Sequence, residues 1–151
     1  MIMKLDLNSI LKMWQDDCEI SEFNLDEASR QTPSLHAKYL ELRSLTKVKL
    51  VATENEQKIL LKAKWLYYNG KMTEQDIKEK GWEFDPFKGI KVLKGEMNYY
   101  YDADTDIQKS EERIQYFKTV LDTLDEIINN LKWRHSTIKN MIDWRRFEAG
   151  G

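Results

Sequence analysis

The stretch IQKSEERIQYFKTVLDTLDEIINNLKWRHSTIKNMIDWRRF, residues 107–147, decides the fold of this chain. In a heptad frame that starts at Ile107, nine of the twelve a and d positions are apolar, and neither Gly nor Pro interrupts residues 96–149. Apolar residues at this spacing are typical of a helix with a coiled-coil-like seam. The pattern therefore predicts one long helix, over residues 105–147, that begins at an Asp104 or Thr105 cap.

Such a helix would run roughly 60 Å, about twice the ~30 Å that spans a small domain. Its seam must therefore meet either another long helix of the same chain or a second chain. We expect self-association through the seam, and an intramolecular two- or three-helix hairpin remains the alternative. Trp133, Trp144 and Phe147 lie outside the seam and would form a second apolar strip on a monomer. The predicted oligomerisation residues are Ile114, Phe117, Leu121, Leu124, Ile128, Leu131, Ile138 and Ile142.

A second long helix is predicted over residues 33–69. Thr32 is a suitable N-cap, Pro33 suits the first helical position, and Asn69-Gly70 is a suitable stop. At 100° per residue, one face gathers apolar side chains and the opposite face gathers basic ones. The apolar face comprises Leu45, Val48, Ala52, Ile59, Ala63 and Leu66, and the roughly opposite basic face comprises Arg43, Lys47, Lys58 and Lys62.

The rest of the chain gives weaker signals. A short helix is expected from Asn8 or Ser9 through Trp14, and residues 16–32 are expected to be looped. Residues 71–104 contain three of the six Gly residues and one of the two Pro residues, and they predict either a loop or a small β-hairpin around Gly95-Glu96. We therefore expect a mainly α, single-domain chain over 1–151. Its expected parts are an acidic segment (1–31), a basic helix (33–70), a loop or hairpin (71–104) and an oligomerisation helix region (105–149).

Charge is segregated along a chain whose net charge is only −2. Residues 1–31 carry 3 basic and 7 acidic groups, and residues 102–126 carry 3 basic and 8 acidic groups. Residues 43–71 carry 7 basic and 2 acidic groups, and residues 132–146 carry 5 basic and 1 acidic. Two basic blocks thus alternate with two acidic ones, which favours binding to a polyanion or pairing between subunits.

Residues for catalysis are not apparent. Cys18, the single cysteine, lies between Asp17 and Glu19, which disfavours a thiolate, and no phosphate-binding Gly-rich loop occurs. His36 and His135 lack a second metal ligand at helical spacing, and the Asp102 to Asp106 cluster is most simply an acidic helix start. No apolar run approaches the ~18 residues of a membrane span. We expect no enzyme, no cofactor, no metal and no membrane association.

The stretch KILLKAKWLYYNGK, residues 58–71, interleaves lysines with aromatic rings. Lysines can follow a phosphate backbone while rings stack on unpaired bases, a combination typical of single-strand binding. The alternative is an amphipathic helix whose lysines are solvated and whose rings are core. The candidate DNA-binding residues are Lys58, Lys62, Lys64, Trp65, Tyr68 and Lys71.

At this stretch the chain resembles the UvsY recombination mediators of tailed bacteriophages. That family carries Lys-Ala-Arg-x-x-Tyr-Tyr after an aliphatic run, which stands here as LLKAKWLYY, residues 60–68. The end of the chain is similar too, with Ile138-Lys139 and then RFEAG at residues 146–150. Looser similarity at residues 44–49 and 92–93 extends the resemblance over most of residues 35–151.

The resemblance implies a non-enzymatic protein that binds single-stranded DNA and assembles as a ring of six or seven subunits. It also implies that the protein loads a RecA-like recombinase onto DNA coated with single-stranded DNA-binding protein, and contacts both partners. The setting would be the cytoplasm of the infected bacterial host. Lys62 and Lys64 would take the DNA-binding roles of the motif, and the C-terminal region would serve oligomerisation.

One departure from the family motif is Lys64, which stands where the family has Arg. An ammonium keeps the charge but loses the bidentate, stacking contact of a guanidinium. Lys62 and Lys64 also point about 200° apart on an ideal helix, so they should face different surroundings. The alternative function is a helical protein-interaction scaffold that does not bind nucleic acid directly.

Overall fold

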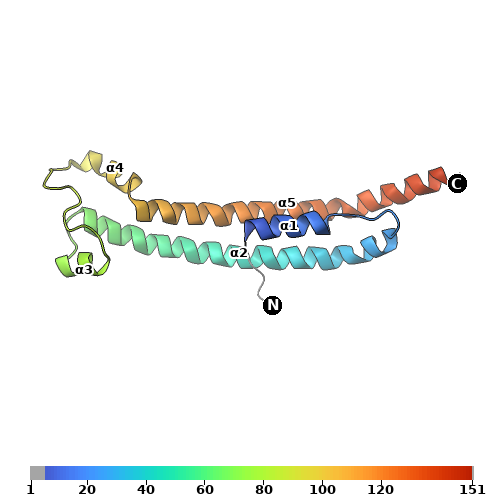
Figure 1. Ribbon diagram of the computed structural model, residues 1–151, viewed down its shortest axis with the longest axis horizontal. Coiled ribbons are helices and arrows are strands. Elements are labelled where there is room, and N and C mark those ends of the chain that lie inside the picture. Colours follow the sequence, from blue (N-terminus) through green and yellow to red (C-terminus); the bar gives the residue numbers. More distant parts are fainter. Residues whose placement is uncertain (1–5, 151) are drawn as a thin grey trace. The chain divides into compact units, whose positions relative to one another are not determined.

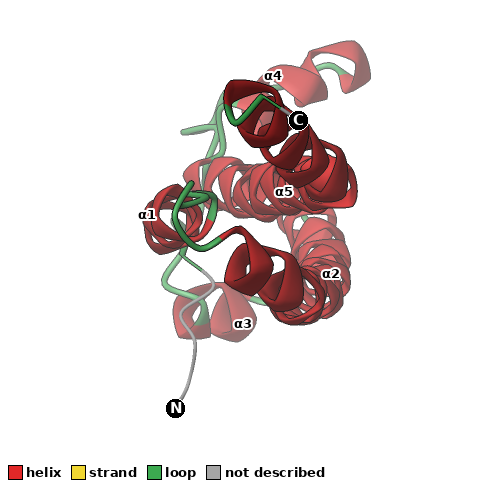
Figure 2. Cartoon of the chain, turned by 90° about the vertical axis from the view of Figure 1, so that its right-hand side faces the viewer, coloured by secondary structure: helices red, strands yellow, loops and turns green. Residues whose placement is uncertain are grey.

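The computed structural model describes residues 6–150, and these residues form helices and loops without a β-strand (Figure 2). The mainly α prediction is confirmed, and the β-hairpin alternative for residues 71–104 is wrong. The chain groups into two compact units, which we describe separately. Unit 1 comprises residues 6–49 and 116–150, and unit 2 comprises residues 50–115. No helix of the described part is long and apolar enough to cross a membrane.

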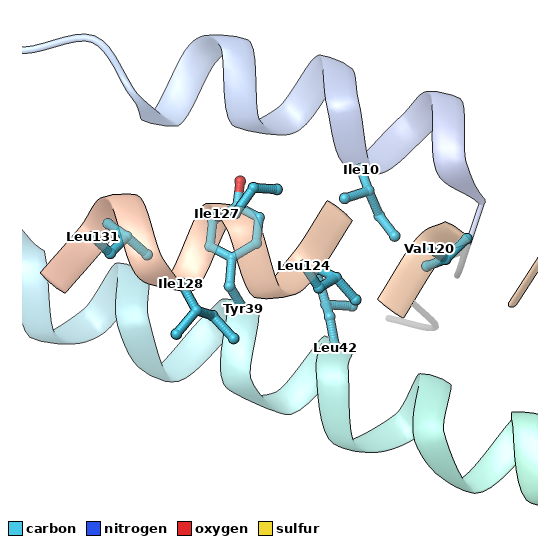
Figure 3. Packing of buried hydrophobic residues seen from close by; sticks show 8 residues of the cluster. All are labelled: Ile10, Tyr39, Leu42, Val120, Leu124, Ile127, Ile128 and Leu131. Atoms are coloured by element: carbon cyan, nitrogen blue, oxygen red, sulfur yellow. The ribbon is translucent and has the colours of Figure 1, made fainter. Parts of the chain in front are cut away.

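Unit 1 is built from three helices that lie side by side (Figure 1). They are α1 (Leu7–Asp17), the first part of α2 (Leu25–Tyr68) and the last part of α5 (Thr105–Glu148). Their apolar side chains point toward one another and make one core (Figure 3). The members of this core are Ile10, Tyr39, Leu42, Val120, Leu124, Ile127, Ile128 and Leu131.

The helix α1 is anchored at both of its ends. Asp6 caps it by accepting a hydrogen bond from the Asn8 N–H, and Tyr116 accepts one from the Leu7 N–H at 2.9 Å. At the other end, Asp17 accepts hydrogen bonds from Lys38 at 2.6 Å and from the Tyr39 hydroxyl at 2.8 Å. The short N-terminal helix is therefore confirmed, with Asp6 as its cap instead of Asn8 or Ser9.

The helix α2 begins eight residues before the predicted start at residue 33, at Leu25. The carbonyl of Asn24 accepts the first helical bond, from Ala28 at 3.0 Å, and Asp26 and Glu27 complement the helix dipole. Pro33 consequently lies inside the helix, where it lacks the N–H that would bond to the preceding turn. Of the expected loop over residues 16–32, only residues 18–24, between α1 and α2, lie outside these helices.

The apolar face of α2 is not the face that the structure buries, although Ala63 and Leu66 are half-buried. Leu45, Val48 and Ile59 are 48%, 69% and 73% exposed. The side chains of α2 that are buried instead lie on another face and include two threonines. Thr46 is accommodated because its hydroxyl donates to the Leu42 carbonyl at 2.7 Å, which satisfies the polar group. The buried members of that face in unit 1 are Tyr39, Leu42 and Thr46, and those in unit 2 include Leu50 and Thr53.

Unit 2 contains the end of α2, the start of α5 and, between them, α3 (Glu74–Glu79), η1 (Lys94–Glu96) and α4 (Met97–Asp102). α2 ends at Tyr68, directly before the predicted Asn69-Gly70 stop, and the φ of 68° at Gly70 lets the Lys71 N–H reach the Leu66 carbonyl at 2.8 Å. α5 begins as predicted at an Asp104 cap, which accepts the Ile107 N–H at 3.0 Å.

A cluster of aromatic rings forms the core of the short helices in unit 2. Tyr67 and Tyr68 are buried at the end of α2, and Ile77 of α3 is buried with them. The residues that pack around these three are Met72, Trp82, Phe87, Met97, Tyr100 and Tyr101. This cluster explains the failed hairpin, since Met97, Tyr100 and Tyr101 reach it at helical spacing.

Candidate nucleic-acid interface

Four of the six predicted DNA-binding residues lie on the surface of unit 2. Lys58, Lys62 and Trp65 follow an i, i+4, i+7 spacing and therefore share one face of α2. All three are exposed, and Trp65 keeps 46% of its surface. We call these three residues, together with Lys71, the α2 basic face.

Lys71 joins this face through the turn that ends α2. The left-handed Gly70 redirects the chain, and the Lys71 ammonium lies 4.6 Å from the centre of the Trp65 ring. A cation over an indole face is attracted by the ring quadrupole. The pair presents an aromatic plane beside a positive charge, which is the combination that a stacked nucleotide requires.

The lysines of the α2 basic face have no acidic partner in the described part of the chain. None of the ion pairs among residues 6–150 involves Lys58, Lys62 or Lys71. The carboxylates of Glu56 and Glu111 engage Arg113 at 3.5 Å and Gln57 at 2.7 Å, respectively. The positive charge of the face is therefore available to an external anion.

Lys64 occupies a different position, inside unit 2. Its side chain is 4% exposed, and its ammonium lies 2.9 Å from carboxylate oxygens of both Asp104 and Asp106. The same ammonium lies 3.8 Å from the centre of the Trp82 ring. The opposite orientations expected for Lys62 and Lys64 are thus confirmed, and Lys64 holds two elements of unit 2 together.

Tyr68 belongs to the same buried network. Its hydroxyl donates to Asp104 at 2.5 Å, and its ring packs edge-on against Tyr101 at a centroid distance of 5.3 Å. This placement corrects the prediction for Lys64 and Tyr68, because neither presents a surface that a DNA strand could contact. Their role is to shape the end of α2 on which the exposed residues lie.

The electrostatics of the network favour an ionised Asp104. Burial alone raises the pKa of this carboxyl, but hydrogen bonds from Tyr68, from the Ile107 N–H and from Lys64 outweigh burial and bring the pKa below its ordinary value. Burial and the bond to Asp104 raise the pKa of the Tyr68 hydroxyl well above its usual range. Asp104 is therefore a carboxylate, and Tyr68 a neutral donor, at neutral pH.

Sequence reasoning missed the partners Asp104, Asp106 and Trp82. It assigned the first two to an acidic helix start, which is correct for Asp104 as a cap but incomplete. These partners could have been predicted by assuming that the end of α2 runs antiparallel to the start of α5, because that arrangement places both carboxylates beside Lys64. Among the described residues, no group of three or more His, Cys, Asp or Glu side chains could hold a metal ion.

The predicted oligomerisation seam lies mostly inside the chain. Its buried residues pack against α1 and α2 in unit 1, or within unit 2 near the start of α5. This corrects the expectation that the seam joins subunits, and the intramolecular hairpin describes it better. The buried members are Ile114, Phe117, Leu124, Ile128, Leu131 and Ile138, while Leu121 and Ile142 are half-buried.

The second apolar strip that the sequence suggested is exposed. Trp144 and Phe147 stack at a centroid distance of 5.5 Å near the end of α5, and they are 61% and 72% exposed. Two grooves flank this part of α5 within unit 1. One is lined by Leu25, Met141 and Trp144, and the other by Phe23, Leu25 and Ile142, each with charged residues at its edge.

Comparison with known proteins gives a consistent result over nearly the whole chain. The family described as "Recombination, repair and ssDNA binding protein UvsY" matches residues 13–151. The recombination protein UvsY of Enterobacteria phage T4 is 30% identical over 145 residues, which are 96% of this chain and 96% of that protein.

Solved structures agree with the sequence match. A crystal structure of the bacteriophage T4 recombination mediator protein UvsY, lattice type II, is similar with a TM-score of 0.79 and 27% identity, over 98% of this chain and 99% of that one. The lattice type I structure gives a TM-score of 0.78 and 26% identity, over 93% and 98%. This chain therefore belongs to the UvsY family of recombination, repair and single-stranded DNA-binding proteins.

Proposed function

We propose that this chain binds single-stranded DNA through the α2 basic face and acts as a recombination mediator. The observation that carries the proposal is the arrangement of Lys58, Lys62 and Trp65 on one helical face, with Lys71 over the ring. Lysine ammoniums would neutralise phosphates, and Trp65 would stack on a base. Lys64 and Tyr68 would support this face from inside.

The mediator role would consist of loading a RecA-like recombinase onto DNA coated with single-stranded DNA-binding protein. A protein that holds DNA in a form that the recombinase prefers shifts the exchange by its differential affinity for the two states. Membership of a family described by recombination and repair supports this role. No covalent step is required, so the proposed function is not enzymatic.

Self-association would place several copies of a weak DNA-binding site on one assembly. Four side chains on one subunit give modest affinity, while copies arranged in a ring of six or seven would bind a strand through high effective concentration. Because the heptad seam is buried, we assign the contact between subunits to the exposed Trp144 and Phe147 and their flanking grooves.

The test of DNA binding is fluorescence anisotropy of a labelled single-stranded oligonucleotide over a salt series. For single strands, log K falls with log salt by about 0.7 for each phosphate contact. The variant Lys58→Gln/Lys62→Gln/Lys71→Gln should lower that slope by about 2 and weaken binding at low salt.

A matched control removes the same charge elsewhere. Lys12, Lys109 and Lys118 are exposed and lie in the acidic blocks, and their Gln variant should bind like the parent. A parent that fails to bind at low salt would leave the interaction scaffold as the better function. The mediator role requires a further assay, in which the protein accelerates recombinase assembly on coated DNA.

A further inference from the structure

The longest non-helical stretch of the described chain connects α3 to η1. We call most of this stretch, together with the first residue of η1, the lysine loop (residues 82–94). Local hydrogen bonds shape its central turn. The Asp85 carboxylate accepts the Phe87 N–H at 3.1 Å and the Gly89 N–H at 2.7 Å. Lys88 and Gly89 then turn the chain with φ of 52° and 79°.

The lysine loop also packs against the aromatic cluster of unit 2. Tyr67 donates its hydroxyl hydrogen to the Glu83 carbonyl at 2.5 Å. The Phe87 ring packs at 4.7 Å from Tyr100, and Trp82 packs at 5.0 Å from Tyr67. Because Tyr67 belongs to α2, the loop is fixed to the same helix end that carries the α2 basic face.

Lysines recur at regular intervals along the lysine loop. Lys88, Lys91 and Lys94 occur at every third position, are exposed, and take part in none of the ion pairs of residues 6–150. No acidic residue lies between Asp85 and Glu96. The loop also contains Glu83 and Asp85, so its net charge is +1, and the three ammoniums form no ion pair with a carboxylate of the described residues.

Exposed apolar side chains accompany these lysines. Phe84 is 65% exposed, and Tyr99 on the adjoining α4 is 75% exposed. The fold does not require these two rings, because Trp82, Phe87 and Tyr100 already supply the aromatic packing. Residues 84–99 thus combine exposed rings with unpaired lysines in one short stretch of the chain, and both are features of a single-strand binding platform.

We propose that the lysine loop is a second single-stranded nucleic-acid contact, in addition to the α2 basic face. Lys88, Lys91 and Lys94 would contact successive parts of the phosphate backbone, and Phe84 and Tyr99 would receive bases. The inference rests on the proposed function and extends its site. An acidic peptide could use the same lysines, but it offers no planar bases to the two rings.

The test is a charge-removal variant, Lys88→Asn/Lys91→Gln/Lys94→Gln. Asn is chosen at position 88 because it tolerates the left-handed backbone there. In the anisotropy salt series, the slope of log K against log salt should fall by about 2, while Lys12→Gln/Lys109→Gln/Lys118→Gln leaves it unchanged. Phe84→Leu, which keeps an apolar side chain but removes the ring, should weaken binding at least about fivefold.

The outcomes separate this inference from the proposed function. If the parent binds DNA and the Lys58/Lys62/Lys71 variant loses slope while the lysine-loop variant does not, only the second contact is overturned. If the parent does not bind, both proposals fail. If the loop variant loses binding to a labelled poly-glutamate peptide but binds the oligonucleotide like the parent, the loop is a protein contact and this inference is wrong. Far-ultraviolet circular dichroism of each variant confirms that the helices remain.

Discussion

The ammonium of Lys64 lies 2.9 Å from Oδ2 of Asp104, and both side chains are only 4% exposed. The pair links the last turns of α2 to the cap of α5, since Asp104 also accepts the Ile107 N–H. The position that the family motif associates with DNA thus serves the folding of unit 2. The positive charge on the surface is carried instead by Lys58, Lys62 and Lys71 of the α2 basic face.

Replacing Lys64 by Met should destabilise the protein strongly. The substitution leaves the buried Asp104 without its cation, and breaking a buried pair in this way costs about 3–5 kcal/mol. The free energy of unfolding, measured by urea denaturation, is the readout. The exposed neighbour Lys62→Met is the control and should change it by less than about 0.5 kcal/mol.

A substitution in the same pair distinguishes a structural role of Lys64 from a direct contact with DNA. Asp104→Asn removes one negative charge beside Lys64 while keeping the shape of the side chain. If Lys64 touched phosphate, this variant would bind single-stranded DNA more tightly. We expect no gain in anisotropy affinity, and a gain would show that Lys64 reaches the strand.

Asp104 should also make stability depend on pH. Its pKa in the folded protein lies below the ordinary 3.8, so the folded state favours the carboxylate more than the unfolded state does. Its contribution is complete above about pH 5 and is lost as the pH falls through the folded pKa. The difference in unfolding free energy between the parent and Asp104→Asn should therefore shrink from pH 5 to pH 3. A constant difference would contradict this assignment.

Tyr39 should report on the docking of α1. Its side chain is fully buried, and its hydroxyl donates to Asp17 at 2.8 Å across the core of unit 1. A hydrogen bond to a charged acceptor contributes about 1.5–3 kcal/mol, so Tyr39→Phe should lower the free energy of unfolding by an amount in that range. Tyr99→Phe, at an exposed ring, is the control and should leave stability unchanged within about 0.5 kcal/mol.

The two long helices follow from local signals in the sequence. Asn69-Gly70 stops α2 because Gly accepts the left-handed backbone there, and Asp104 starts α5 because its carboxylate caps the helix. These effects act over a few residues, so the sequence reveals them. The start of α2 was misplaced because Pro33 suits a first turn. The earlier turns begin at the Asn24 carbonyl and bury Leu25 and Ala28, and this burial depends on tertiary packing.

Burial on α2 depends on partners that the sequence does not name. Apolar side chains occur on more than one of its faces, so periodicity could not decide between Leu42, which is buried, and Val48, which is exposed. The burial of Lys64 could not be predicted either, because a lysine in a basic stretch normally indicates a charge on the surface. Its burial becomes understandable only when the antiparallel start of α5 brings Asp104 beside it.

Self-association should depend on the stacked pair at the end of α5 and not on the heptad seam. Trp144→Ser/Phe147→Ser removes two exposed rings that contact each other, so it should reduce the assembled mass in sedimentation velocity while circular dichroism stays unchanged. Trp133→Ser is the matched control, because Trp133 is 63% exposed on the same helix but is not part of the stacked pair of Trp144 and Phe147. By contrast, Leu124→Ala opens a cavity in a fully buried position and should cost about 2–5 kcal/mol of stability. An assembly that survives the double variant would place the subunit contact elsewhere, for which the exposed Val48 and Leu45 of α2 would be the next residues to change.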